Sequence, residues 1–590
     1  MRSLFYFALL VSTRIAFADE TEEKKCEAIE SRFTSELNEH KQPVCTCAEN
    51  GLFSRNSGMA IECESASLIS ISENLASLNG TELGSLLIRD STINVLPNDV
   101  FENINSRHLR LERCGLSTIS PNIFTPSLGE TLESVSFREN RLKTIVSEQF
   151  KSLPKLKLID LSANKIIAIE KNAFKKMVNV EELLLNGNEL EVLEADDFEG
   201  MKSLKKLNLE GCMIKRIEKG AFRGLSSLEQ LILTGNQLET LDSTVFAGLK
   251  NLRVLELGGN QLTAVEIKSL PKLEKLVLNN NQIETMKSVK LKDLPSLVVA
   301  MMDRNNIRVV GDMDMVGLIK SEKLATVSFA YNNISVFGSK AFQHIPNLIN
   351  LLMNNNQLSE LSNNLTPFLA PLKNLVTLQV SSNNLTIIRS GELPKSLVNL
   401  AVDHNAIERI EPRALEGIAL KRLYLNSNKL QFLYQGAFDS FPPSTVEAID
   451  VSLNSWQCVC KDPKEWLPRW LSEAEESDVS EGPIGCLAIP GCGMGGESHE
   501  FEEEEEQGRA GWITIAATVL TVITIVIMAT IGIIYFRDYR LQFNLRGRRS
   551  YSDLHKLIEN DPPKSDSIFV VPPMPKRNGA PKKTVRFENF

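Results

Sequence analysis

The sequence predicts an α/β solenoid, which is an elongated stack of short repeats sharing one long parallel sheet. Three observations lead to this prediction. A pattern of apolar residues followed by a polar residue recurs along most of the chain, a series of Phe recurs in phase with it, and four cysteines cluster at each end of the repeats. With 590 residues, 43% of them hydrophobic, the chain is long enough for such an array and its continuous core.

The repeat reads L-x-x-I-x-L-x-x-N-x-I from Leu156 to Ile166. Its polar position, called here the key position, recurs at 140, 164, 188, 212 and 236, and continues to 454 with gaps of 21 to 27 residues. Two degenerate repeats with Ser91 and Cys114 at this position precede it, which makes sixteen repeats. Alternate residues of L-x-L point inward, so each repeat is predicted to contain a short strand. The Asn amide can then bond backbone groups of the turn and of the adjacent repeat.

The Phe series has the same period, at Phe150, Phe174, Phe198, Phe222 and Phe246. These rings are predicted to stack inside the convex side as core residues.

Cys114 and Cys212 occupy the key position, where a small buriable residue fits without any redox role. They stand four repeats apart, which is too far for a disulfide between them.

This pattern resembles the extracellular, 24-residue class of leucine-rich repeats found in cell-surface receptors and adhesion proteins. The resemblance covers roughly residues 26 to 492 and implies a horseshoe with a concave parallel sheet and disulfide caps. Ser455 departs from it, because this class usually has Pro after the last Asn. The eight cysteines of the two clusters are predicted to form disulfides, with three pairings open in each cap: Cys26, Cys45, Cys47, Cys63, Cys458, Cys460, Cys486 and Cys492.

Targeting features divide the rest of the chain. An apolar run followed by Ala16-Phe17-Ala18 predicts a cleaved signal peptide, with an uncleaved anchor as the alternative. Uncharged residues 512–536 predict a transmembrane helix, and the five arginines after it place the C-terminus inside, as in a type I plasma-membrane protein. The predicted parts are a signal peptide (1–18), N-terminal cysteine cap (19–63), repeats (64–454), C-terminal cysteine cap (455–492), acidic stalk (493–511), transmembrane helix (512–536) and disordered cytoplasmic tail (537–590).

Two kinds of short motif add predicted sites. N-x-[ST] sequons predict N-glycosylation at Asn79, Asn333, Asn364 and Asn384, with Asn364 doubtful because Pro367 follows its Thr. In the tail, Lys583, Val585 and Phe587 resemble the docking motif for protein phosphatase 1. Glu588 and Phe590 resemble the C-terminus of a PDZ ligand. The alternative for both tail motifs is a disordered tail with a basic flank.

The concave sheet is the predicted binding surface. Side chains between the two core positions of each strand should face the concave side, and several of them are apolar in the middle of the array. The predicted partner-binding residues are Leu184, Ile232, Glu256, Val277, Met301, Leu352 and Tyr424. The alternative is that these are strand-forming residues without a partner.

These observations predict a cell-surface receptor or adhesion protein with a developmental role. It would bind an extracellular or cell-surface protein ligand, or a second copy of itself as a homodimer, and would recruit adaptors through its tail. The net charge of −9 argues against nucleic-acid binding. No catalytic grouping of residues stands out, so neither an enzyme nor a cofactor is expected.

Two alternatives remain at this point: an organiser of extracellular matrix or of an apical surface, and a scaffold whose tail tethers phosphatase or granule components. The layout and length also resemble invertebrate leucine-rich-repeat transmembrane proteins of the dendrite-receptor and P-granule-associated types.

Overall fold

The computed structural model describes residues 81–456, apart from 99, 103, 148, 151 and 152. It also describes residues 26, 45–48, 58–69, 71, 75 and 466–475. The predicted signal peptide, acidic stalk, transmembrane helix and tail therefore lie outside the described residues, as do Asn79 and the four cysteines of the predicted C-terminal cap.

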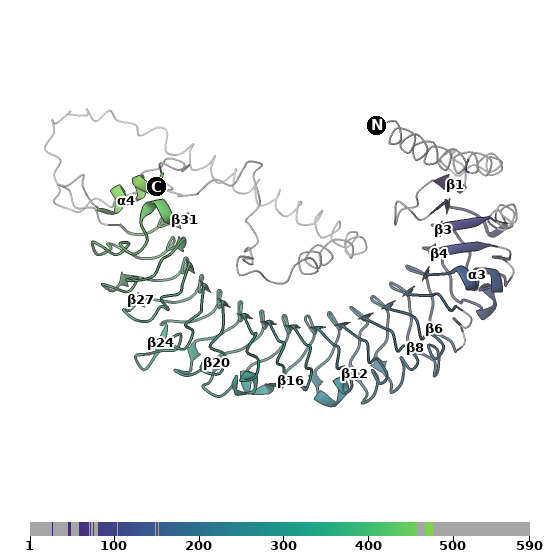
Figure 1. Cartoon of the computed structure of the whole chain (residues 1–590), viewed down its shortest axis with the longest axis horizontal. Coiled ribbons are helices and arrows are strands. Elements are labelled where there is room, and N and C mark those ends of the chain that lie inside the picture. Colours follow the sequence, from purple (N-terminus) through teal and green to yellow (C-terminus); the bar gives the residue numbers. More distant parts are fainter. Residues whose placement is uncertain are drawn as a thin grey trace, which may run out of the picture. The chain divides into compact units, whose positions relative to one another are not determined.

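One long sheet runs through the described repeats, with its strands stacked in chain order along an arc (Figure 1). β1 pairs antiparallel with β2, and from β2 onward each strand pairs parallel with the next. The 18 strands are β1 (Cys45–Ala48), β2 (Ala60–Glu64), β3 (Glu82–Arg89), β4 (Asn105–Glu112), β5 (Ser134–Ser136), β7 (Leu158–Asp160), β9 (Glu182–Leu184), β11 (Lys206–Asn208), β13 (Gln230–Ile232), β15 (Val254–Glu256), β17 (Lys275–Val277), β19 (Val299–Met301), β21 (Thr326–Ser328), β23 (Asn350–Leu352), β26 (Thr377–Gln379), β28 (Asn399–Ala401), β30 (Arg422–Tyr424) and β31 (Ala448–Asp450).

Smaller elements connect these strands. Short sheets are formed by β6 (Thr144–Ile145) with β8 (Ala168–Ile169), β10 (Val192–Leu193) with β12 (Arg216–Ile217), β14 (Thr240–Leu241) with β16 (Ala264–Lys268) and β18 (Val289–Lys292), β20 (Val309–Val310) with β22 (Val336–Phe337), β24 (Ser362–Asn363) with β25 (Thr366–Pro367), and β27 (Ile387–Ile388) with β29 (Arg409–Ile410). The helices whose bounds the structure describes are η1 (Pro121–Ile123), α3 (Pro126–Thr131), η2 (Ser243–Phe246), η3 (Met286–Ser288), η4 (Val316–Leu318), η5 (Pro443–Thr445) and α4 (Trp466–Glu475).

The key Asn residues form the predicted hydrogen-bonded ladder. The Asn188 amide nitrogen donates to the carbonyl oxygens of Leu185 (2.6 Å) in its own repeat and Leu161 (3.0 Å) in the preceding one. Its side-chain oxygen accepts from the backbone N–H of Ile166 at 3.0 Å. One buried side chain therefore satisfies backbone groups of two repeats, which would otherwise be buried without partners.

Cys212 and Cys114 take the place of Asn in this ladder, as predicted. The Cys212 thiol donates to the Leu185 carbonyl at 3.1 Å, and the Cys114 thiol donates to the Ile88 carbonyl at 3.4 Å. Both cysteines are buried and free, and burial raises the pKa of both thiols to about 11. They are therefore structural residues that stay protonated at neutral pH.

The Phe residues pack inside the convex side, as predicted. Phe150, Phe174, Phe198 and Phe222 are fully buried, and their rings stack with successive centroids 6.1–6.5 Å apart. A second group of stacked rings begins at Phe337. In the repeats between Phe246 and Phe337 the convex side changes, because the longer strands β16 and β18 pair there.

Both ends of the described array are closed. At the N-terminal end, disulfides join Cys26 to Cys47 and Cys45 to Cys63, which selects one of the three pairings that the sequence left open. At the C-terminal end, Trp470 of α4 lies edge-on to the ring of Phe438, with centroids 5.1 Å apart. The structure thus confirms the solenoid, its parallel sheet and its N-terminal disulfides.

Candidate protein-binding surface

The predicted partner-binding residues lie where the sequence analysis placed them. Each is the last residue of a strand, and the strands pair in register, so that Ile232 lies beside Glu256, Glu256 beside Val277, and Val277 beside Met301. We call these seven residues the concave row: Leu184, Ile232, Glu256, Val277, Met301, Leu352 and Tyr424. Neighbouring strands of a sheet lie about 4.8 Å apart, so adjacent members of the row are close enough to share one partner.

The side chains of the concave row differ in how accessible they are. Leu184, Ile232, Met301 and Leu352 are half-buried, which leaves part of each apolar side chain facing solvent. Tyr424 is also half-buried, and burial raises the pKa of its hydroxyl. The accessible apolar area is therefore carried by four residues on β9, β13, β19 and β23.

Two members of the row are more buried than the sequence suggested. Val277 is 6% exposed and Glu256 is 7% exposed, so neither offers much surface to a partner. The cause is packing across strands: Lys275 pairs with Glu256 at 2.9 Å, and Val277 lies between Glu256 and Met301. A period-two pattern predicts which way a side chain points but not how closely its neighbours cover it.

Next to the row lies a polar group that the sequence analysis did not single out. Asp303 accepts hydrogen bonds from the Ser328 hydroxyl, from the Ala330 backbone N–H (3.0 Å) and from the Asn279 amide (3.3 Å). Burial raises the pKa of the Asp303 carboxyl. This network joins three neighbouring repeats beside Met301 and so stiffens the middle of the concave face.

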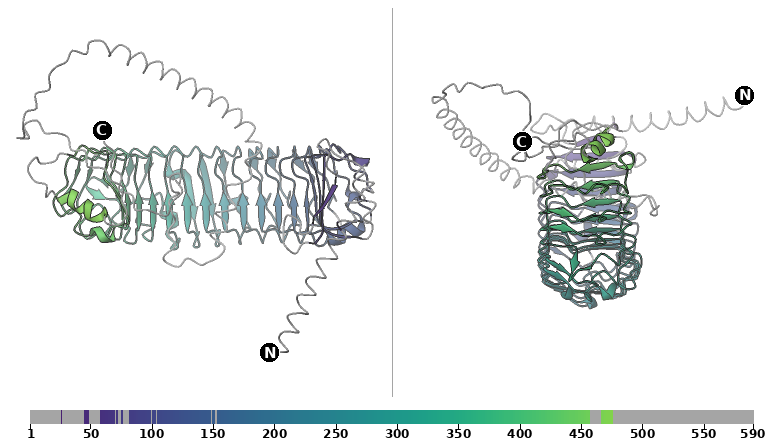
Figure 2. Two further views of the ribbon diagram at one scale, coloured as in Figure 1. Left: turned by 90° about the horizontal axis from the view of Figure 1, so that it is seen from above. Right: turned by 90° about the vertical axis from the view of Figure 1, so that its left-hand side faces the viewer.

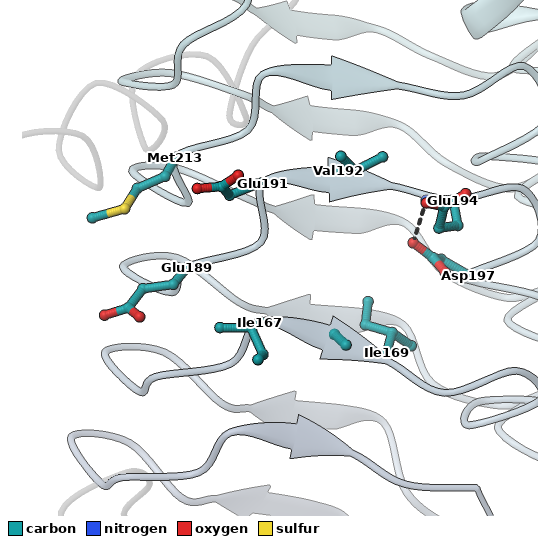
Figure 3. Close-up of a pocket in the computed structure, with 9 residues that line it drawn as sticks. Ile167, Ile169, Glu189, Glu191, Val192, Glu194, Asp197 and Met213 are labelled. Atoms are coloured by element: carbon teal, nitrogen blue, oxygen red, sulfur yellow. Dashed lines mark hydrogen bonds between the residues drawn. The ribbon is translucent and has the colours of Figure 1, made fainter.

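A pocket of about 440 Å³ lies away from the main sheet, along β8 and β10 (Figure 3). Ile167, Val192 and Met213 are among its apolar lining residues, and Glu194 and Asp197 are among its acidic ones. Burial raises the pKa of the Asp197 carboxyl to about 6, although this carboxylate accepts the Glu194 backbone N–H at 2.8 Å.

Two further acidic side chains of this pocket form ion pairs at the surface. Glu189 is paired with Lys165 at 2.8 Å and Glu191 with Lys215 at 2.9 Å. Glu194 and Asp197 take no part in these two ion pairs, so the pocket lining keeps an acidic character.

Three of the predicted glycosylation sites fall in the described part of the chain. Asn333 and Asn384 are exposed, and each directly follows a key Asn. Asn364 is exposed in the turn between β24 and β25. Exposure is needed for glycosylation, and whether these sites are used stays a prediction.

The comparisons with known proteins agree with this architecture. Models of the leucine-rich repeat match residues 130–190, 156–214, 179–238, 202–262 and 395–445, and a model of two such repeats matches 250–296. The fold and these matches together define a leucine-rich-repeat protein.

The chain belongs to the family of the P-granule-associated novel protein 1 of Caenorhabditis elegans. It is 63% identical to that protein over 597 residues, covering all of both chains.

More distant similarities cover smaller shares of the chain. Lumican of Gallus gallus is 34% identical over 125 residues, which are 21% of this chain and 35% of lumican. Among solved structures, the crystal structure of the TLR13–ssRNA13 complex matches with a TM-score of 0.57 and 22% identity, covering 70% of this chain and 59% of that one. This last similarity shows the fold alone.

The predicted plasma-membrane location is wrong. The relative that matches the whole chain is named for its association with P granules, which contradicts a type I protein of the cell surface. In the parts of the chain that the structure describes, no helix is both long and apolar enough to span a membrane. The segment that prompted the prediction, 512–536, lies outside those parts.

Proposed function

We propose that this chain is a non-catalytic scaffold that holds a protein partner against its concave row. One observation carries the proposal: Leu184, Ile232, Met301 and Leu352 keep apolar surface accessible along a single register of the sheet. One or two strands separate each of these four side chains from the next, and all four face the same side of the sheet. Accessible apolar side chains gathered on one face of a folded protein are typical of interaction surfaces. The name of the full-length relative leads us to propose further that the partner is a P-granule component.

A double substitution tests the proposal. Ile232→Asp with Met301→Asp puts two charges on the accessible surface, and we expect partner binding to weaken roughly a hundredfold, because anchor residues each contribute about 1–2 kcal/mol or more. The tagged full-length chain is purified from cells, and the amount of each copurifying protein is compared with that of the wild type.

The matched control is Val178→Asp with Val309→Asp, which charges two exposed apolar residues outside the concave row. Partners lost in the first variant and kept in the control support the proposal. The same set of partners in both variants would show that the concave row does not bind.

A receptor or adhesion role is the second candidate, and the N-terminal disulfides favour it. Cys26–Cys47 and Cys45–Cys63 are bonds of the kind that form in oxidising compartments. Alkylation of free thiols at the moment of lysis, followed by peptide mass spectrometry, discriminates between the candidates. Intact disulfides in the cellular protein would favour the receptor or adhesion role, and alkylated cysteines would favour the granule scaffold.

The tail motifs extend the scaffold proposal. Lys583, Val585 and Phe587 would dock protein phosphatase 1, and Glu588 with Phe590 would bind a PDZ adaptor. A peptide of residues 571–590 that retains neither phosphatase nor a PDZ protein from lysate would remove both assignments.

A further inference from the structure

The residues directly before the strands of the main sheet form a second row, along the edge where the strands begin. Backbone bonds hold it in register: the N–H of Ile349 donates to the Ala325 carbonyl (2.8 Å), and the N–H of Val376 donates to the Ile349 carbonyl (2.8 Å). Five consecutive members are apolar and form what we call the edge stripe: Val298, Ala325, Ile349, Val376 and Val398.

The edge stripe is accessible. Ile349, at its centre, is 42% exposed, and the other four side chains are half-buried. An apolar stripe five repeats long on the edge of a solenoid is a candidate docking surface, and the residues at its two ends indicate what it docks.

Each end of the stripe is bounded by an ion pair in the same row. Arg253 and Glu274 precede it and pair at 2.9 Å, and Lys421 and Glu447 follow it and pair at 3.2 Å. In chain order the nine positions read positive, negative, five apolar, positive, negative. This order becomes complementary to itself when one copy is reversed.

We propose that the edge stripe binds a second copy of this chain, antiparallel, about a two-fold axis through Ile349. In that arrangement the stripes of the two copies cover each other. Glu274 of one copy lies opposite Lys421 of the other, and Arg253 lies opposite Glu447, so that every charge at the ends of the stripe meets its opposite. Such an interface is isologous, the kind found in two-fold symmetric dimers.

The charges select this register over its neighbours. A shift by one strand in one direction places Glu274 opposite Glu447 and Val298 opposite Lys421. A shift in the other direction places Arg253 opposite Lys421. Both shifts bring like charges together, which opposes association, so only the register centred on Ile349 satisfies the whole row.

The curvature of the solenoid is compatible with this dimer. The strands lie side by side along the arc (Figures 1 and 2), and a two-fold axis along the radius of the arc lays two arcs edge against edge. The nine positions extend over roughly 40 Å at the usual strand spacing. Both concave faces then open to the same side, which leaves the concave row free for a partner.

Two charge-swapped variants of the full-length chain test the proposal. The first exchanges one pair, Arg253→Glu with Glu274→Arg, and the second exchanges the other, Lys421→Glu with Glu447→Lys. Each variant keeps an ion pair within its own chain but would face a second copy of itself with like charges. We expect the wild type to sediment as a dimer and each variant alone to be a monomer, with self-association weakened at least about a hundredfold.

Mixing the two variants is the decisive measurement. Each variant is complementary to the other at all four charged contacts, so the mixture should restore a dimer of one copy of each, measured by sedimentation velocity. A monomeric wild type, a first variant that remains dimeric, or a mixture that stays monomeric would overturn the proposal.

A measurement of thermal unfolding and one further variant control for misfolding. Arg422 also pairs with Glu447, at 2.7 Å, so the second swap is checked by its thermal unfolding. Ile349→Asp charges the exposed centre of the stripe, and we expect it to yield a folded monomer. A folded Ile349→Asp variant that is still dimeric would also contradict the proposal. No partner protein enters these measurements, so they are independent of the test of the concave row.

Discussion

At the scale of single residues, the key position decides whether the turns of the solenoid can be buried. The side-chain oxygen of Asn236 accepts from the backbone N–H groups of Cys212 (3.0 Å) and Ile214 (2.9 Å). Its amide nitrogen donates to the carbonyls of Leu209 and Leu233, both at 2.9 Å. Few side chains carry both an acceptor and two donors in so small a volume, which explains why Asn recurs at this position.

We therefore expect Asn236→Ala to lower the free energy of unfolding by about 3 kcal/mol, because it leaves buried backbone groups without partners. Urea unfolding followed by circular dichroism measures the change. The matched control is Cys212→Asn, which restores the amide one repeat earlier and should be neutral or stabilising by up to about 1 kcal/mol. If both variants lost the same free energy of unfolding, side-chain volume and not hydrogen bonding would decide which residue fits the key position.

At the scale of elements, stacked rings pack the convex side of the described repeats from Phe150 to Phe222. The Phe150 and Phe174 rings lie nearly parallel, at 11°, and Phe174 and Phe198 at 10°. Each ring contacts the one above and the one below, so a ring contributes to the cohesion of three repeats. Where the series stops, beyond Phe246, paired strands β16 and β18 replace it.

Phe174→Ala should destabilise the solenoid by about 3–5 kcal/mol, because it leaves a cavity between two rings that stay in place. Phe174→Leu keeps most of the volume and should cost less. Hydrogen exchange measured by mass spectrometry should show faster exchange in β7, β9 and β11 for the Ala variant. Uniform acceleration over the whole array would show instead that the array unfolds as a single cooperative unit.

At the scale of the whole molecule, each repeat contacts mainly its neighbours, so the ends need their own protection. At the N-terminal end, β1 covers β2, and the Cys45–Cys63 bond joins these two strands. A disulfide in such a cap stabilises the first repeats directly and the distant ones only through the chain of neighbours between them.

Replacing this bond by Cys45→Ser with Cys63→Ser should cost about 2–5 kcal/mol locally. Hydrogen exchange should quicken in β2 and β3, while β15 and β17 in the middle of the array keep their wild-type rates. Loss of protection in the middle strands as well would contradict the near-neighbour description.

The sequence predicted which residues face the concave side, but it did not predict which of them are accessible to a partner. The alternation of L-x-L placed Ile232 and Met301 on the concave face, because the direction of a side chain in a strand depends only on its position. The near-complete burial of Val277 and Glu256, and the Asp303 network, depend on which side chains of other repeats lie beside them. The edge stripe was missed for a related reason: its five members are about one repeat apart in the chain and become a surface only when the strands align.

The sequence by itself determined the solenoid, its repeat, the Asn ladder and the Phe core, because a pattern that recurs within each repeat specifies the local structure of every repeat alike. The tertiary structure alone decided the pairing of Cys26 with Cys47 and of Cys45 with Cys63, the accessible part of the concave row and the register of the edge stripe. These features depend on distances between residues of different repeats, and such distances are defined only once the repeats have stacked.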